Sequence, residues 1–254
     1  MTWDEINRKR LPFIRMGERL FKGMYNDIKI QLKEVIRDRQ TPEQIIEAVR
    51  GFGFDDQIVQ SAYLRFYTKT GLNYAKDTKN NLSGMELKDA DYDIWLLQMT
   101  EYVRSNVGVN ITSVIRTAYK DIESITQKAV ELGIEEGWGM DKIAREIVKK
   151  QGSIDTWKAL RIARTEVVAA SGEGTRLGGE SVAGNKIKVW ISTFDGRSRK
   201  DHMAMDGVRV AFNEDFITPK GNSLFSPGDP KCIDPSDIIN CRCGYEVIVE
   251  PEIY

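Results

Sequence analysis

The spacing of apolar residues changes once along this chain, at Asn185, and that change constrains the fold more than any other feature. Before Asn185, apolar residues recur at intervals of three and four, most regularly from Ile111 to Leu132, which is the period of an amphipathic helix. After it, apolar and polar residues alternate, which is typical of a strand. We therefore expect an α+β protein, with a mainly helical region over residues 1–184 and a compact β-rich domain over residues 185–254.

The helical region is predicted to contain several helices separated by polar or glycine-containing breaks. One helix is expected over residues 3–39, and another follows Thr41, a residue type that caps helices. The polar stretch 77–89 is interpreted as a loop or a joint between subdomains. Gly152–Ser153 predicts a further break, after which a last helix over residues 154–180 is expected to pack on the β-rich domain.

The β-rich domain is predicted to be built around one pair of strands. We expect these strands at residues 187–193 and 243–249, and we expect them to pair with each other. In the first of them, Lys188 and Trp190 alternate with aliphatic residues. The remaining elements are a short helix, a third strand and a long irregular loop rich in proline and glycine, at residues 198–205, 208–212 and 215–237.

Composition excludes several classes of protein. With 41% apolar and 30% charged residues, the chain is typical of a globular protein rather than a disordered one. Its 37 basic and 38 acidic residues give a net charge of −1, which argues against nucleic-acid binding driven by bulk charge. No apolar run approaches the roughly 20 residues of a membrane span, and the first residues lack the apolar region of a secretory signal. We therefore expect no membrane partner, and we expect the protein to work in a cytoplasm or in something assembled there.

Four residues of the C-terminal region are candidate metal ligands. They are the only histidine of the chain and all three of its cysteines: His202, Cys232, Cys241 and Cys243. Imidazole and thiolate are the usual ligands of tetrahedral zinc, and two cysteines two positions apart in a strand point to the same face. The C-x-C spacing differs from the common C-x-x-C pattern. Zinc binding and reduced, buried cysteines beside a hydrogen-bonded histidine therefore both stay open.

Charged residues are concentrated around His202. The set consists of Asp195, Arg197, Arg199, Asp201, Asp206 and, further along the chain, Arg242. An Asp–His pair can serve general acid–base chemistry or hold a catalytic metal. No nucleophile motif accompanies the set, so we favour a structural network in which carboxylates accept hydrogen bonds from arginine and turn N–H groups.

An ADP-ribosyltransferase pattern of Arg, Ser-Thr and Glu-x-Glu can be aligned with Arg164, Ser192–Thr193 and Glu250–Pro251–Glu252. These residue types are common and their spacing is loose, so we do not favour this function. Arg164 and Glu166 are two positions apart on a predicted helix and face different directions. We expect each of them to pair with another element.

An ordered set of short motifs in the last third of the chain resembles a known family. The motifs are IARTE at Ile162–Glu166, Trp190 in a strand, DGRSRKDH at Asp195–His202, DG at Asp206–Gly207, FNEDF at Phe212–Phe216, PGDP at Pro227–Pro230 and NCRC at Asn240–Cys243. In this order they resemble the phage Mu F-like head morphogenesis family, the minor head proteins of tailed phages.

The resemblance implies a structural role. Proteins of this family enter the prohead in few copies, associate with the portal, and affect head assembly or the fate of packaged DNA at ejection. The implied partners are portal, coat or scaffold proteins, with contact to packaged DNA, and the implied location is inside the virion head. The resemblance transfers no catalytic residue. It covers Arg164, Glu166, Trp190, Asp195, Arg197, Arg199, His202, Asp206, Gly207, Asn240, Cys241, Arg242 and Cys243, but not Cys232.

Two alternatives to a non-enzymatic head protein are considered. One is a metal-dependent enzyme, a nuclease or a toxin-like effector, centred on His202 and the nearby acids. The other is an internal protein that contacts DNA through Arg8, Lys9 and Arg10.

Overall fold

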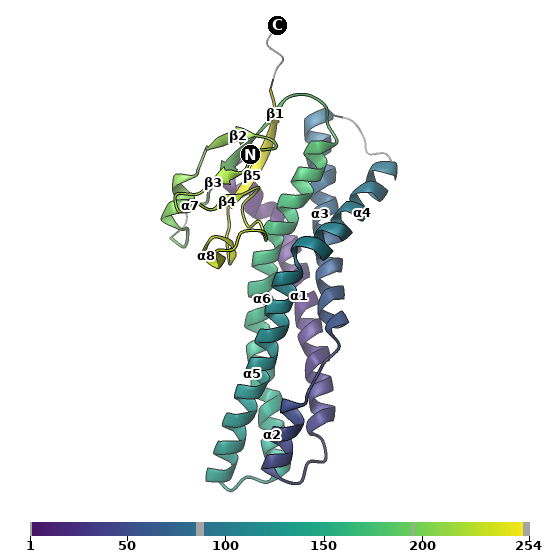
Figure 1. Ribbon diagram of the computed structural model, residues 1–254, viewed down its shortest axis with the longest axis vertical. Helices are drawn as coiled ribbons and strands as arrows, with labels where there is room; N and C mark the ends of the chain where they lie inside the picture. Colours follow the sequence, from purple (N-terminus) through teal and green to yellow (C-terminus); the bar gives the residue numbers. More distant parts are fainter. Residues whose placement is uncertain (1, 85–88, 195, 251–254) are drawn as a thin grey trace. The chain divides into compact units, whose positions relative to one another are not determined.

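A computed structural model describes residues 2–84, 89–194 and 196–250 of the chain. Long helices come first and short antiparallel strands come last, which confirms the predicted α+β class (Figure 1). In chain order the elements are α1 (Trp3–Ile36), α2 (Pro42–Arg50), α3 (Asp56–Ser83), α4 (Asp89–Asn106), α5 (Gly108–Glu135), α6 (Met140–Glu180), β1 (Lys186–Ile191), α7 (Lys200–Ala204), β2 (Arg209–Ala211), β3 (Phe216–Ile217), β4 (Ser223–Leu224), α8 (Pro235–Ile238) and β5 (Gly244–Val249). None of the helices described combines the length and the apolar character needed to cross a membrane.

The residues form two compact units, each made from separate stretches of the chain. The first unit comprises residues 1–17, 64–108 and 161–254, and the second comprises residues 18–63 and 109–160. Because α1, α3 and α6 each contribute to both units, the first unit combines helix ends with all of the strands. The division of the chain at residue 184 stays a prediction.

The second unit is a helical assembly held by aromatic pairs. The rings of Phe21 and Tyr63 lie 5.2 Å apart. Phe54 stacks on Tyr119 at 4.6 Å, and the backbone N–H of Phe54 donates a hydrogen bond of 3.1 Å to the Tyr119 hydroxyl. This combination ties the short connection before α3 to the middle of α5.

In the first unit, β1 is the central strand of a three-stranded antiparallel sheet with the order β2-β1-β5. It pairs with β5 from Lys186 opposite Val249 to Ile191 opposite Gly244, which confirms the predicted pairing. The stretch 215–237, predicted to be irregular, instead contains the two-residue strands β3 and β4, which pair with each other, and the short helix α8. Strands of this length are too short to leave an alternation pattern in the sequence.

One predicted interruption of the helices is wrong, and another is shorter than expected. Helix α6 runs without a break through Gly152 and Ser153, because one glycine costs a helix only about 1 kcal/mol and neighbouring turns and packing offset it. Helix α3 continues to Ser83, into the stretch predicted as a loop. Its Asp77 forms an ion pair of 2.8 Å with Lys9 of α1, so a polar residue here contributes to helix packing. Residues 85–88 of the predicted loop lie outside the described chain, and a joint between subdomains stays a prediction.

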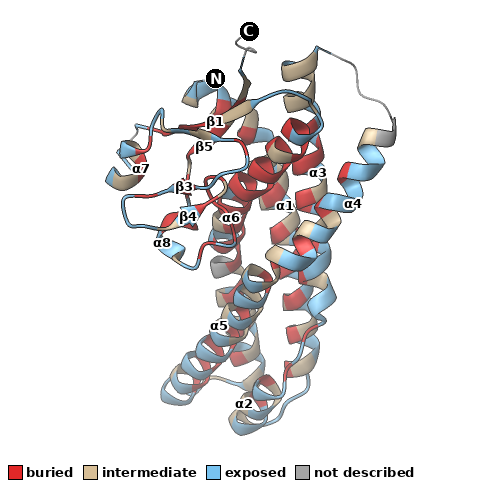
Figure 2. Ribbon diagram, turned by 45° about the horizontal axis from the view of Figure 1, so that its top comes forward, coloured by how far each residue is buried: buried red, intermediate tan, exposed pale blue. Residues whose placement is uncertain are grey.

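The C-terminal half of α6 is buried on almost every side (Figure 2). A β-carbon added to Gly174 would lie 2.2 Å from the carbonyl oxygen of Gly71 in α3, and one added to Gly178 would lie 2.3 Å from the carbonyl oxygen of Ala75. On the sheet side, the Tyr245 hydroxyl donates a hydrogen bond of 2.8 Å to the Gly172 carbonyl. The glycines of α6 therefore permit the direct approach of another helix and of the sheet.

Both faces of β1 are buried, so the alternation in its sequence does not mark a solvent-exposed face. Lys188 and Trp190 are fully buried. The Lys188 ammonium donates a hydrogen bond of 2.6 Å to the Phe225 carbonyl and lies 3.2 Å from the centre of the Phe225 ring. Burial lowers the pKa of Lys188 to about 8. The carbonyl and the ring compensate in part for the water that the ammonium loses.

The contact between α3 and α6 predicts a large effect of one methyl group. Gly174→Ala places a β-carbon against backbone that cannot rotate away, so we expect a loss of about 2–3 kcal/mol in the free energy of unfolding. Gly23→Ala is the matched control, since a β-carbon there meets nothing within 4 Å inside α1. It should stabilise the protein by about 1 kcal/mol through helix propensity. Urea denaturation of both variants measures the difference, and equal effects would contradict the close contact.

The lowered pKa of Lys188 predicts that the free energy of unfolding depends on pH. Its pKa is about 8 in the folded protein and 10.5 for the unperturbed group. Between these values the unfolded chain binds more protons than the folded one, so the free energy of unfolding rises with pH. The variant Lys188→Met lacks this titration. The stability of the wild type minus that of Lys188→Met should be constant below about pH 8 and should increase above it; a flat difference up to pH 10 would refute the assignment.

Candidate functional site

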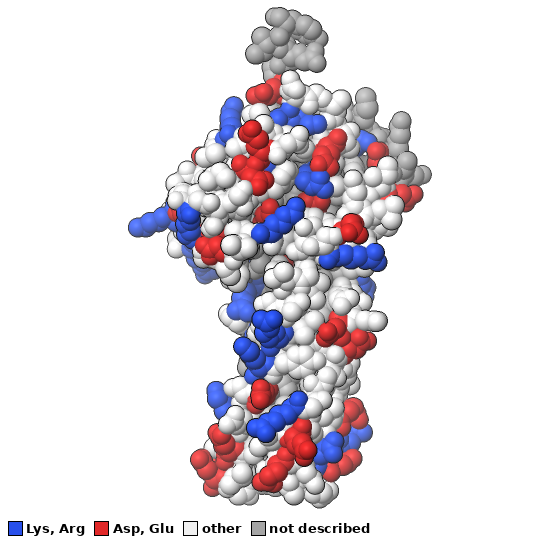
Figure 3. Space-filling view, viewed as in Figure 1, with Lys and Arg blue, Asp and Glu red and all other residues white. Residues whose placement is uncertain are grey.

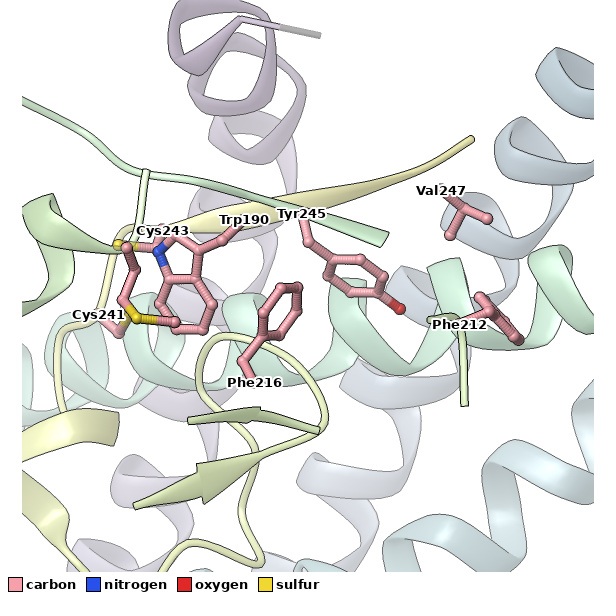
Figure 4. Close-up of a cluster of buried hydrophobic side chains, with 8 residues drawn as sticks. Trp190, Phe212, Phe216, Cys241, Cys243, Tyr245 and Val247 are labelled. Atoms are coloured by element: carbon pink, nitrogen blue, oxygen red, sulfur yellow. The ribbon is translucent and has the colours of Figure 1, made fainter. Parts of the chain in front are cut away.

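His202 of α7 lies against the two cysteines of the NCRC motif. Its Nδ1 atom is 3.5 Å from Cys241 Sγ and 3.6 Å from Cys243 Sγ. All three side chains are almost completely buried, with exposed fractions of 2–3%. Figure 4 shows the two cysteines at one end of a hydrophobic cluster, beside the indole of Trp190. The structure thus brings together three of the four predicted metal ligands.

Cys232, the fourth predicted ligand, lies elsewhere. It is packed with Leu224 and Ile238 in a separate small cluster, and its thiol is 3.8 Å from the carbonyl of Asp234. Within the described residues it does not belong to the group of possible ligand atoms around His202. Its position agrees with its absence from the family motif.

Motif residues shape the backbone on both sides of the cluster. Asp206 accepts a hydrogen bond of 2.7 Å from the backbone N–H of Ser192, which connects the end of β1 to the turn after α7. Gly207 has φ of 75°, a conformation that favours glycine, and its N–H donates to the Trp190 carbonyl. Arg199, just before α7, donates to the Ile239 carbonyl. These contacts hold α7 and the NCRC segment close to the end of β1.

The cysteine segment itself is fixed by an unusual backbone turn and by Thr165. Asn240 has φ of 55°, in the left-handed region that asparagine tolerates better than most residues. Its N–H donates a hydrogen bond of 3.1 Å to the Thr165 hydroxyl in α6. Cys241 and Cys243 lie immediately before β5 rather than inside it. Both sulfurs nevertheless reach the same imidazole.

A carboxylate binds the other side of the imidazole. His202 Nε2 is 3.4 Å from Asp237 Oδ1. Asp237 is completely buried and also accepts hydrogen bonds from Thr218, Lys220 and Asn222. Burial raises the pKa of Asp237, but the hydrogen bonds from Asn222 and Lys220 and the charge of Lys220 have a larger opposite effect, so the net pKa lies below the ordinary value. Asp237 is therefore an anion that can accept a hydrogen bond from the imidazole N–H.

The two thiols differ in acidity. The hydrogen bond with Cys241 is the largest effect on Cys243, and together with His202 it lowers the pKa of Cys243 to about 4. The same contact, with burial, raises the pKa of Cys241 well above its ordinary value. Burial alone lowers the pKa of His202, but hydrogen bonding to Cys243 and its charge raise the net pKa. The cluster therefore stabilises one thiolate without any added ion.

Arg10 of α1 is a site residue that sequence analysis missed. It is 6% exposed, and it donates hydrogen bonds of 3.0 Å to the carbonyls of Arg242 and Cys243 and of 3.1 Å to the Ser171 hydroxyl. It lies more than 230 positions from the cysteines and is one of several basic residues in its helix. Nothing in its local sequence distinguishes it from a surface arginine.

Asp237 and Lys220 were also missed, because both lie in the stretch predicted to be irregular. The Asp234–Pro235 pair is a signal for the start of a helix, and Asp234 does cap α8 through the N–H of Ser236. That signal places Asp237 on a turn but does not show that the turn faces His202.

The remaining motif residues are distributed between the core and the surface. Glu166 is buried and accepts a hydrogen bond of 2.5 Å from the Tyr67 hydroxyl, so it does pair with another element. Arg164 is exposed on α6. Trp190 donates from its indole to the Ser192 hydroxyl at 3.0 Å and contacts His202 edge to face. Asp195 lies outside the described residues.

The residues aligned with an ADP-ribosyltransferase pattern do not converge. Ser192 follows the last residue of β1, whereas Glu250 follows the last residue of β5 and bonds to Asn185 at the start of β1. Asn185 and Ser192 are seven positions apart along extended chain, which corresponds to about 23 Å. Ser192 and Thr193 are also buried, and Glu252 lies outside the described residues. These residues therefore do not form one site in the described chain.

The chemistry that this arrangement offers is the binding of a soft cation. Two sulfurs and one imidazole nitrogen lie within 4.8 Å of one another, and such ligands suit zinc. A second group, Asp201, His202 and Asp237, meets the same distance criterion. Lys220 already bridges its carboxylates, at 3.1 Å from Asp201 and 3.0 Å from Asp237.

Comparison with known proteins gives one family and one curated relative. Residues 124–246 match the family described as phage Mu protein F like protein. A protein of Enterococcus faecalis named NAD(+)--arginine ADP-ribosyltransferase EFV is 30% identical over 197 residues, which cover 72% of this chain and 37% of that protein. The chain thus spans little more than a third of this relative's length, and no solved structure gave a significant match.

The matched stretch contains the end of α5, all of α6, β1 to β4, and the whole His202–Cys241–Cys243 cluster. Residues 124–246, just under half of the chain, are thus similar to the phage Mu protein F like family, and this similarity supports a bacteriophage head protein.

Proposed function

We propose that this protein is a minor head protein, present in few copies inside the head and bound to portal, coat or scaffold proteins. Its role would be in head morphogenesis and in the release of DNA at ejection. The observation that carries the proposal is the family match over residues 124–246. This stretch includes nearly all of the residues that build the sheet and the cysteine cluster, so the match concerns a folded core rather than a short motif.

The use of polar residues in the first unit supports a structural role. Arg10, Glu166 and Asp206 each hold two distant segments together, through Cys243, Tyr67 and Ser192 respectively. Buried hydrogen bonds of this kind give a unit a single packing arrangement. A head protein needs such a rigid unit to survive packaging forces while its other surfaces bind neighbours.

The alternative of a metal-dependent nuclease or toxin-like effector receives less support. His202 is 2% exposed, and both of its ring nitrogens are engaged, by the cysteines and by Asp237. A catalytic base has to reach its substrate at hydrogen-bond distance. The name of the Enterococcus faecalis relative describes a protein of which this chain covers 37%, and Ser192 and Glu250 lie at opposite ends of β1.

Contact with DNA through the N-terminal basic residues is also less supported. Two of the three basic side chains at positions 8–10 already have partners in the protein. Lys9 pairs with Asp77 at 2.8 Å, and Arg10 donates hydrogen bonds to buried carbonyls. Figure 3 shows positive and negative side chains interspersed on the face in view. Such a surface does not provide the concentrated positive charge that phosphate binding uses.

Head incorporation can be measured directly. Quantitative mass spectrometry of purified proheads should detect this protein at a small fraction of the coat protein's copy number, and crosslinking should join it to portal, coat or scaffold. The infected-cell lysate provides the control for expression. Absence from proheads while the protein is abundant in the lysate would refute the proposal.

The enzymatic alternative has its own test. The full-length protein, incubated with DNA or RNA and Mg²⁺, Mn²⁺ or Zn²⁺, should leave the nucleic acid intact, because His202 is not accessible to a polymer. Gel electrophoresis measures cleavage, with His202→Ala as the comparison. Metal-dependent cleavage by the wild type that disappears in His202→Ala would favour the nuclease instead.

A further inference from the structure

We propose that His202 Nδ1, Cys241 Sγ and Cys243 Sγ bind one zinc ion, which closes the C-terminal part of the first unit. The site is structural, and it is independent of the role proposed above. The proposal rests on the distances between the ligand atoms, on the hydrogen bonds that orient the imidazole, and on the chemistry of the surrounding charges.

The distances fit a tetrahedral site. With zinc–sulfur bonds of about 2.3 Å and zinc–nitrogen bonds of about 2.0–2.1 Å, tetrahedral angles place a sulfur and a nitrogen ligand about 3.6 Å apart. The observed separations from His202 Nδ1 are 3.5 Å to Cys241 Sγ and 3.6 Å to Cys243 Sγ. The separations between the nitrogen and the two sulfurs therefore already match those between corners of the required tetrahedron.

The imidazole is oriented as a metal ligand. Metal-binding histidines usually donate their second N–H to a carboxylate, which fixes the tautomer. Here Asp237 lies 3.4 Å from Nε2 and is itself held by Thr218, Lys220 and Asn222. A proton on Nε2 leaves the lone pair of Nδ1 directed at the two sulfurs.

The carboxylate side of His202 is a poorer place for the ion. The Lys220 ammonium lies within 3.1 Å of both Asp201 and Asp237 and occupies the position that a cation between them would take. The sulfur side instead presents two cysteine sulfurs to the imidazole. A divalent ion there would balance two buried thiolates, which are expensive to bury without a counter-charge.

The ligand types select zinc over harder cations. Thiolate and imidazole suit zinc, whereas magnesium and calcium prefer oxygen. Among the described residues, no further His, Cys, Asp or Glu joins the three ligands. The described residues thus supply three of the four positions of a tetrahedral site. Cys232 is excluded because its thiol lies in another cluster.

Such an ion would connect segments that are distant in the chain. It would join α7 to the residues before β5 and, through Asp237, to α8. In the chain, α7 and the residues before β5 are separated by a long stretch of turns and two-residue strands. This stretch has little hydrophobic core of its own. A metal that links the two ends of a long loop offsets part of the entropy of ordering it.

The experiment uses the full-length protein purified without chelator, with zinc measured by inductively coupled plasma mass spectrometry. The wild type should contain about one zinc per chain, and Cys241→Ser, Cys243→Ser and His202→Gln should each lose it. Cys232→Ser is the matched control and should retain it. The absence of zinc from the wild type, or an equal loss in Cys232→Ser, would overturn the proposal.

A second measurement decides the matter even when the ligand variants fail to fold. Cobalt(II) added to the chelator-treated wild type and to Cys232→Ser should produce the thiolate-to-cobalt charge-transfer band and the strong visible bands of a tetrahedral site. Asp237→Asn should keep these bands at saturation but bind cobalt about 10–100-fold more weakly. If added cobalt neither produces these bands nor changes the reactivity of the cysteines, the thiols are hydrogen-bonded without a metal and the proposal is overturned.

Discussion

The close approach of α6 to its neighbours is the constraint on which the rest of the first unit depends. Gly174 and Gly178 let the carbonyls of α3 come within van der Waals distance of the α6 backbone. Gly172, two residues before Gly174, accepts a hydrogen bond from Tyr245 of β5 at its carbonyl. A side chain at these positions would separate the helix from its partners, and the sheet would lose the surface on which it is built.

The cysteine cluster depends on that arrangement in turn. Thr165 of α6 binds the N–H of Asn240, and Arg10 of α1 binds the carbonyl of Cys243. Two helices thus hold the NCRC segment in place, and the segment presents its sulfurs to His202. The cysteines depend on α6 for their position. This dependence explains why a family motif that extends over about eighty residues includes both an α6 segment and the cysteines. The motif records a packing arrangement rather than a catalytic set.

Sequence reasoning was accurate where one local pattern decides the structure. The long amphipathic helices and the pairing of β1 with β5 follow from periodicity, and the NCRC and His202 motifs were correctly associated. It was inaccurate where packing overrides local preference. Gly152 does not end α6, because the neighbouring helical turns stabilise the helix at this position. Lys188 is buried because its ammonium contacts the carbonyl and the ring of Phe225.

The sequence by itself determined the α+β class and the resemblance to the phage Mu protein F like family, and it singled out His202, Cys241 and Cys243, because these follow from residue type, period and order. Only the tertiary structure decided that Cys232 lies outside the cluster and that Arg10 and Asp237 lie beside it. The placements of Asp237 and Arg10 depend on contacts between residues 35 and 233 positions apart. The energy of such contacts comes from burial and hydrogen-bond geometry, which no local stretch of sequence contains.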